Sequence, residues 1–166
     1  MDSTPFSSAL IVGAGSGLSA SLARLFKRHG MKIALAARNP AKLQPLQDET
    51  GAAAFACDAT DRRQVQTLFE EASAKNGEPD VVVYNAGGHL RGPLIDLDPA
   101  GVERLLSVAF GGFLVAQEAA RRMLPKGRGA ILFTGASASV KGYPQSAPFA
   151  KGSSHCAVSP RAWRGS

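Results

Sequence analysis

The segment SALIVGAGSGLS, residues 8–19, passes from a short apolar run through three glycines into a helix-like pattern. The apolar run predicts a buried strand of a parallel sheet, because helices cover both faces of such a strand. The glycines predict a tight turn at the end of that strand. Large apolar side chains then recur at the spacing of a helix that ends before Gly30: Leu18, Leu22, Leu25 and Phe26. The segment therefore predicts a strand, a turn and a helix.

A glycine turn between a strand and a helix suits the binding of a pyrophosphate group. Gly13 permits the turn, and Gly15 or Gly17 lets backbone N–H groups approach an anion. The first N–H groups of the helix have no partner within it, and the helix dipole favours negative charge there. A glycine turn that only joins strand to helix is the alternative. Three glycines in five residues at this junction favour a dinucleotide site.

The end of the second predicted strand, Lys32–Ala37, bears on the choice of dinucleotide. Sites that select NAD usually carry an acidic residue here, which binds the ribose 2′-hydroxyl. This chain has Arg38-Asn39 instead, and a guanidinium group suits a 2′-phosphate. We therefore expect NADP(H) rather than NAD(H), the alternative being an exposed arginine ahead of a helix.

Apolar strands and helices continue to alternate along the chain. Three further strands are predicted, at Ala52–Cys57, Asp80–Tyr84 and Gly129–Thr134. Helices are predicted from Pro40, after Thr60 or Asp61, and from Pro99 to about Met123. This alternation predicts an α/β fold, a Rossmann-like doubly wound parallel sheet of about five strands. Residues 1–150 form this domain, and residues 151–166 are expected to be an irregular tail.

The overall composition excludes several classes of protein. The 166 residues carry a net charge of +6, but Lys and Arg are scattered and no aromatic residues are interleaved with them, so we expect no nucleic acid partner. No uninterrupted apolar run reaches the roughly 18 residues of a membrane span, and no secretory signal is found, so we expect a cytoplasmic protein without a membrane partner. Cys57 and Cys156 lack metal-site spacing and are expected to be free thiols, with no metal.

These motifs, taken in order, resemble the short-chain dehydrogenase/reductase family. Gly13 and Gly17 match its glycine pattern, with Ser19 in place of the third glycine. Cys57-Asp58 resembles the acid that binds the adenine amino group, Asn85-Ala86-Gly87 resembles a segment lining the cofactor, and residues 108–115 resemble a long helix of the family. The resemblance and the turn together predict these cofactor-binding residues: Gly13, Gly15, Ser16, Gly17, Leu18, Arg38, Asn39, Asp58, Ala59, Asn85, Ala86 and Gly87.

The resemblance implies an NADP-dependent oxidoreductase that transfers hydride between the cofactor and a carbonyl or alcohol of a small-molecule substrate. In the family an asparagine, a serine, a tyrosine and a lysine support proton transfer. Those positions fall here on Ala109, Ala136, Phe149 and Ser153. Alanine and phenylalanine cannot transfer a proton. The nearest groups of suitable chemistry are Ser137, Tyr143 and Lys151, with Thr134 and Ser139 as further hydroxyls.

The alternative function is a non-catalytic nucleotide-binding remnant or regulatory module of the same fold. The family continues through another helix and two more strands; we expect this chain to be truncated before them and therefore do not expect the family's homo-oligomer. Residues 152–166 also suggest a frame-shifted translation, because a shifted frame permits an amphipathic helix of the type that the family carries there. The coding DNA beyond Ser166 tests this hypothesis.

Overall fold

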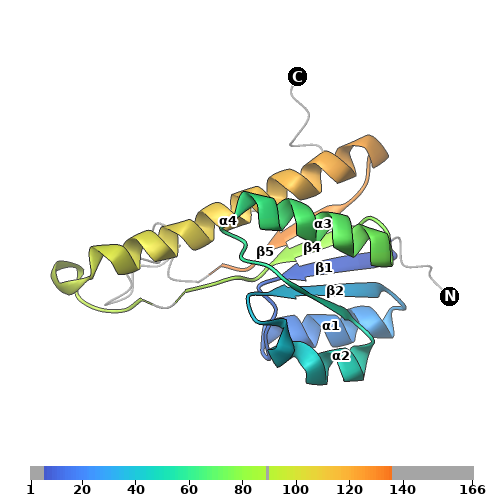
Figure 1. Cartoon of the computed structure of the whole chain (residues 1–166), viewed down its shortest axis with the longest axis horizontal. Helices are drawn as coiled ribbons and strands as arrows, with labels where there is room; N and C mark the ends of the chain where they lie inside the picture. Colours follow the sequence, from blue (N-terminus) through green and yellow to red (C-terminus); the bar gives the residue numbers. More distant parts are fainter. Residues whose placement is uncertain (1–5, 89, 136–166) are drawn as a thin grey trace.

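A computed structural model describes residues 6–88 and 90–135 of the chain. These residues form one parallel sheet with the strand order β3-β2-β1-β4-β5 and helices on both faces (Figure 1). The strands are β1 Ser8–Val12, β2 Lys32–Ala37, β3 Ala53–Ala56, β4 Val81–Tyr84 and β5 Ala130–Phe133. The helices are α1 Leu18–Arg28, α2 Gln44–Thr50, α3 Arg62–Asn76 and α4 Pro99–Met123, with 3-10 turns η1 Pro40–Leu43, η2 Leu94–Asp96 and η3 Leu124–Lys126. The predicted Rossmann-like doubly wound sheet is confirmed.

Successive side chains of the three central strands β2, β1 and β4 enter two separate cores. Ala9 and Ile11 of β1 pack with α1, η1 and α2, whereas Leu10 and Val12 pack with α3 and α4. Phe69 of α3 is completely buried in the second core. Burying a side chain such as valine, leucine or phenylalanine contributes about 1.5–3 kcal/mol, so these two cores hold the helices on the sheet.

The predicted extent of α1 is right, and two of its four large apolar side chains, Leu22 and Phe26, pack partly buried against the core, whereas the other two do not. Leu18 and Leu25 are 52% and 37% exposed. The buried residues of α1 are small: Ser19, Ala20 and Ala23. Small side chains let the helix axis approach the sheet closely, so the large apolar side chains lie along the margin of the contact.

Helix α4 is divided into two unlike halves. Its first part projects beyond the sheet (Figure 1) and exposes Leu106 and Phe110, whereas all its buried residues except Gly101 lie from Gly111 onward. By length and composition, Pro99–Lys126 is long and apolar enough to cross a membrane. The sequence predicted no segment of this kind, because Glu103-Arg104 and Gln117-Glu118 interrupt its apolar residues. Its second half packs on the sheet and on α3, as a core helix does.

Buried polar groups tie the amino ends of the strands together. The Asp80 carboxylate, before β4, accepts hydrogen bonds from Ser7 N (2.7 Å), Ser7 Oγ (2.8 Å) and Arg128 Nη2 (3.0 Å). Burial tends to raise the pKa of Asp80, but the hydrogen bonds from Ser7 and the charge of Arg128 outweigh it and lower the pKa. Asp80 thereby joins the beginnings of three strands, because Ser7 precedes β1 and Arg128 precedes β5.

Residues 136–166 lie outside the described part of the chain. The predicted domain limit at residue 150, the irregular tail and the frame-shift hypothesis therefore stay predictions.

Candidate functional site

All twelve predicted cofactor-binding residues follow the carboxyl end of a strand. Residues 13–18 follow β1, Arg38-Asn39 follow β2, Asp58-Ala59 lie just beyond β3, and residues 85–87 follow β4. Because the strands are parallel, these segments meet at one edge of the sheet. The fold therefore brings together the groups that the sequence separates.

Gly13 forms the turn that leaves β1. Its φ of +80° lies in the left-handed region, and its N–H and that of Ala14 both donate to the carbonyl oxygen of Ala36 at 2.9 Å. A Cβ atom at Gly13 would lie only 2.3 Å from the Ala86 nitrogen. Gly13 is therefore required by the backbone of the turn and by its contact with the segment after β4.

Gly15 and Gly17, unlike Gly13, are not required by the backbone conformation or by packing within the described chain. Neither has a positive φ, and a Cβ atom at either position would have no heavy atom of the protein within 4 Å. Nothing in the packing of the described residues excludes a side chain there. The absence of side chains leaves the backbone accessible at the start of α1, as the close approach of a pyrophosphate requires.

The amino terminus of α1 is not capped by a side chain. Gly17 is its N-cap, and no acidic residue lies in the first turn. The other long helices differ, since Asp61 accepts hydrogen bonds from backbone N–H groups of α3 and Asp98 does the same for α4. The first N–H groups of α1 thus remain available to an anion, beside the exposed Ser16, Gly17 and Leu18.

Arg38 and Asn39 lie at the end of β2. The side chain of Arg38 is exposed and makes no hydrogen bond or ion pair with any of the described residues 6–88 and 90–135. The side chain of Asn39 caps η1, because its Oδ1 accepts a hydrogen bond from Ala41 N (3.2 Å). Of the two, Arg38 has the donors that an anionic group needs.

Asp58 and Ala59 lie between β3 and α3. One carboxylate oxygen of Asp58, Oδ1, accepts hydrogen bonds from Thr60 N (3.0 Å) and Thr60 Oγ1 (2.8 Å). No described residue donates to its other oxygen, Oδ2. Ala59 is buried against α4. Asp58 therefore keeps one acceptor for an external donor at the same edge of the sheet.

Asn85, after β4, is joined to the glycine turn. Its N–H donates to the Val12 carbonyl (2.8 Å), and its Nδ2 donates to Ser19 Oγ (2.7 Å). Ser19 Oγ in turn donates to the Gly13 carbonyl (3.4 Å). The sequence analysis noted Ser19 only as a replacement for the family's third glycine. The sequence signal was a run of small residues, Ser19, Ala20 and Ala23, which favours a close approach of the helix to the sheet but does not identify Asn85 as the partner.

Tyr84, the last residue of β4, is a second residue that the sequence analysis missed. Its hydroxyl donates to the Val108 carbonyl of α4. Gly111 and Gly112 make room for the ring, since a Cβ atom at Gly111 would lie 2.9 Å from Tyr84 Oη. Burial, followed by the nearby charges of Asp58 and Cys57, raises the pKa of Tyr84 to about 12. Tyr84 is therefore a packing residue and not an acid or base at neutral pH.

Among the predicted catalytic positions, only Ala109 is described. It lies exposed on α4, and its methyl group cannot form a hydrogen bond. Thr134, after β5, uses its hydroxyl to donate to the Tyr84 carbonyl (3.4 Å). The other positions lie outside the described residues: Ala136, Ser137, Ser139, Tyr143, Phe149, Lys151 and Ser153. Within the described chain, no group of three His, Cys, Asp or Glu side chains is arranged to hold a metal ion.

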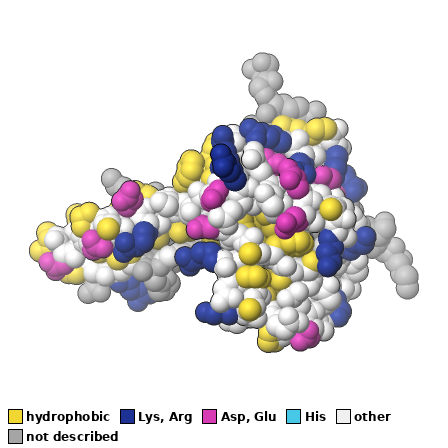
Figure 2. All heavy atoms as spheres, in the orientation of Figure 1, with side chains coloured by type: hydrophobic (Ala, Val, Ile, Leu, Met, Phe, Trp, Pro, Cys, Tyr) yellow, Lys and Arg dark blue, Asp and Glu magenta, His cyan; other side chains and the backbone are white. Residues whose placement is uncertain are grey.

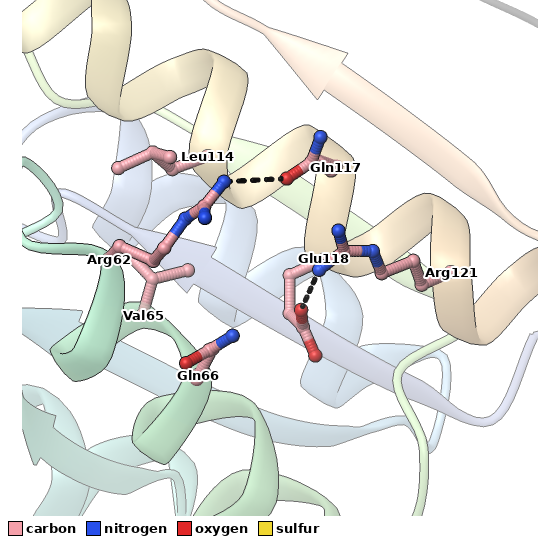
Figure 3. Close-up of a pocket in the computed structure, with 7 residues that line it drawn as sticks. All are labelled: Arg62, Val65, Gln66, Leu114, Gln117, Glu118 and Arg121. Atoms are coloured by element: carbon pink, nitrogen blue, oxygen red, sulfur yellow. Dashed lines mark hydrogen bonds and ion pairs between the residues drawn. The ribbon is translucent and has the colours of Figure 1, made fainter.

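A shallow groove lies between α3 and α4, away from these segments (Figure 3). Among its lining residues, Arg62 of α3 donates to Gln117 of α4 (3.4 Å), and Glu118 pairs with Arg121 within α4 (3.5 Å). None of the residues that line it belongs to the predicted cofactor site. The groove is a gap between two helices whose polar groups satisfy one another, so it does not carry the candidate site.

Comparison with known proteins decides the family. The sequence model of a family described as short chain dehydrogenase matches residues 7–158. The chain belongs to the short-chain dehydrogenase family. The family resemblance inferred from the glycine turn, Asp58 and the segment after β4 is thereby confirmed.

Curated relatives of this short-chain dehydrogenase chain include plant and bacterial enzymes. It is 39% identical over 132 residues to (+)-borneol dehydrogenase 1 of Salvia officinalis, a match covering 76% of this chain and 50% of the relative. It is 32% identical over 130 residues to D-threitol dehydrogenase of Mycolicibacterium smegmatis, covering 75% of this chain and 50% of the relative. The chain thus spans about half the length of the curated relatives it matches.

Solved structures show the same fold. A short-chain dehydrogenase from Rhodopseudomonas palustris aligns with a TM-score of 0.79 and 30% identity, covering 88% of this chain and 71% of that one. An actinorhodin polyketide ketoreductase, solved with NADPH, aligns with a TM-score of 0.82 over 86% of this chain and 58% of that one. At 24% identity, this second match supports the fold alone.

Proposed function

We propose that the chain binds NADP(H), in preference to NAD(H), across the carboxyl ends of β1 to β4. The observation that carries the proposal is the start of α1, where uncapped N–H groups lie beside two glycines that nothing in the packing requires. The family to which the chain belongs is one of oxidoreductases that use nicotinamide cofactors. The residues present fit such a dinucleotide, because donors for a pyrophosphate and for a 2′-phosphate lie at one edge of the sheet.

Each end of the cofactor has its own expected partners. The backbone from Gly15 to Leu18 would hold the pyrophosphate, and Arg38 would pair with the 2′-phosphate. The Asp58 oxygen that has no donor among the described residues suits the adenine amino group. Residues 85–87 would line the cofactor where β4 ends, beside the Gly13 turn.

As the activity, we propose hydride transfer between NADP(H) and a carbonyl or alcohol of a small-molecule substrate. The bound nicotinamide would supply the hydride chemistry. A cytoplasmic location and the absence of a nucleic acid partner are part of this proposal. On the face shown in Figure 2, Lys and Arg side chains are interspersed with acidic ones and do not gather into one basic patch.

A second candidate function is nucleotide binding without turnover, as a remnant or regulatory module. Ala109 favours it, because this residue cannot support a proton relay from α4. The sequence substitutions at Ala136, Phe149 and Ser153 point the same way. A screen of aldehydes, ketones and alcohols, read by NADPH absorbance, separates the two candidates. Consumption with any substrate supports the oxidoreductase, and binding without consumption supports the module.

Titration of the full chain with NADPH and with NADH, followed by nucleotide fluorescence, tests the cofactor. We expect Arg38→Ala to weaken NADPH binding roughly 10- to 100-fold, because a charge-assisted hydrogen bond contributes about 1.5–3 kcal/mol. NADH binding should be unchanged. The matched control is Lys126→Ala in η3, which removes an exposed positive charge from a segment outside the predicted site. Equal effects of both variants, or equal losses for both nucleotides, would contradict the assignment of Arg38.

A further inference from the structure

Ser19 places one buried hydroxyl between two parts of the candidate site. The residue is 0% exposed, at the second position of α1. Its Oγ accepts a hydrogen bond from Asn85 Nδ2 at 2.7 Å and donates to the Gly13 carbonyl at 3.4 Å. A hydroxyl has one donor and two acceptor sites, so both bonds form together. The turn after β1 is thereby linked, through a side chain, to the residue after β4.

Two further contacts make this link stiff. The Asn85 N–H donates to the Val12 carbonyl at 2.8 Å, which extends the β1–β4 pairing by one bond. Gly13 lies against Ala86 so closely that no Cβ atom would fit between them. The Gly13 turn and residues 85–86 therefore have backbone contacts as well as the Ser19 bridge. A shift of one would break contacts to the other.

The bridge is not needed for the general packing of α1. The buried Ala20 and Ala23 and the partly buried Leu22 and Phe26 form the apolar contact of this helix with the core that contains Ile11 and Val83. The hydroxyl of Ser19 adds a polar, directional bond to that contact. Such a bond contributes little free energy compared with the apolar core, but enough to favour one position of the glycine turn.

We infer that Ser19 and Asn85 act as a coupled positioning pair, which holds the glycine turn in its nucleotide-binding arrangement before the nucleotide arrives. The inference rests on the proposed function, because it assigns the pair a role toward the same dinucleotide. Without the bridge, the glycine turn samples other arrangements, so a smaller fraction of molecules is competent to bind. The apparent affinity falls in proportion to that fraction. The pair contributes by raising that fraction.

The test combines variants with binding kinetics on the full chain. Ser19→Ala removes only the hydroxyl, Asn85→Leu removes the donor at similar volume, and the double variant removes both. Ser21→Ala is the matched control, because Ser21 is an exposed serine on the same helix. NADPH dissociation constants and association and dissociation rates are measured by stopped-flow fluorescence, and Tm is measured without nucleotide.

We expect each single variant to raise the NADPH dissociation constant about five- to tenfold, as the loss of one hydrogen bond implies. The association rate of NADPH should fall, because the nucleotide binds only when the glycine turn is in its competent arrangement. The dissociation rate should stay within about twofold of that of the unmodified chain. The double variant should match Asn85→Leu and not multiply the two losses. Ser21→Ala should bind as the unmodified chain does.

Four outcomes would overturn the inference. Unchanged NADPH binding in Ser19→Ala, or multiplied losses in the double variant, would show that the pair does not act as a unit, while the proposed function would stand. A loss of Tm with unchanged binding rates would assign Ser19 a structural role only. If the unmodified chain binds neither NADPH nor NADH, the proposed function fails together with the inference. Should Ser19→Ala not fold, Ser19→Gly replaces it, because it removes the same hydroxyl from a residue that is not itself a predicted cofactor contact.

Discussion

The two ends of the parallel strands differ in how their polar groups are satisfied. At the amino ends, the Asp80 carboxylate is buried and takes hydrogen bonds from Ser7 and Arg128. At the carboxyl ends, the first N–H groups of α1 have no side-chain cap, and Arg38 has no partner among the described residues. The polar groups at the amino ends of the strands are thus satisfied within the protein, whereas donors at the carboxyl ends remain exposed. The difference indicates which end stabilises the fold and which end receives a ligand.

The largest expected effect tests whether the carboxyl end also carries structural constraints. Gly13→Ala should lower the free energy of unfolding by about 3 kcal/mol or more, because it adds left-handed strain to a backbone collision with Ala86. Gly30→Ala is the matched control, with a similar φ of +72° and no heavy atom within 4 Å of its Cβ position. It should cost about 1–2 kcal/mol. Urea denaturation followed by circular dichroism measures both, and equal losses would show that the collision is relieved by movement of Ala86.

The next effect concerns the amino end and depends on pH. The pKa of Asp80 is lowered in the folded chain, so its contribution is present above the unfolded pKa of about 4 and is lost as the pH falls through the folded value. Asp80→Asn should therefore cost about 2 kcal/mol at pH 7 and much less in acid. Urea melts between pH 2 and pH 7 measure this difference. NADPH affinity should not change, and a change would contradict the separation of the two ends.

A smaller effect is expected when a side-chain cap is added at the start of α1 and removed from the start of α3. Gly17→Asp should cap α1 and stabilise the fold by about 1 kcal/mol, while its negative charge weakens NADPH binding. Asp61→Ala should remove the cap of α3 and destabilise the fold by a similar amount, without affecting the nucleotide. Thermal melts and nucleotide titrations of both variants measure the contrast. Unchanged NADPH binding by Gly17→Asp would indicate that the start of α1 does not receive the pyrophosphate.

The smallest effect probes how tightly the carboxyl end is packed. Cys57, just beyond β3, is buried, and burial followed by the charges of Asp58 and Asp61 raises its pKa to about 11. At pH 8 its thiolate fraction is then about 0.001, so alkylation should be at least ~100-fold slower than that of a free cysteine. Iodoacetamide labelling of a Cys156→Ser variant isolates this thiol. A rate near that of free cysteine would show that this end of the sheet opens readily.

The strands were predictable because parallel strands are buried on both faces. Apolar runs bounded by glycine or aspartate located all five described strands to within one or two residues. The start of α4 was predictable from Pro99, and the preceding Asp98 caps the helix. The segments of the candidate site followed from strand ends, since a parallel sheet brings those ends to one edge.

Contacts between distant segments could not be predicted in the same way. The orientation of α1 depends on how closely Ala20 and Ala23 approach the sheet, and the sequence pattern drew attention to the leucines instead. The partnership of Tyr84 with Gly111 and Gly112 needs the crossing of β4 and α4, which no local spacing encodes. The bridge from Ser19 to Asn85 likewise joins residues that only the completed sheet makes neighbours.

The place of β1 in the middle of the sheet has a consequence for synthesis in the cell. Ser7, at its start, is separated by 73 residues from Asp80, which it must bind. At roughly 5–20 residues per second, a ribosome needs about 4–15 s to make the intervening chain. During that interval the side of β1 that will pair with β4 has no partner strand, although β2 is already available. The nascent chain is then most exposed to wrong strand pairing, so binding by a chaperone in that interval would benefit folding more than binding after release.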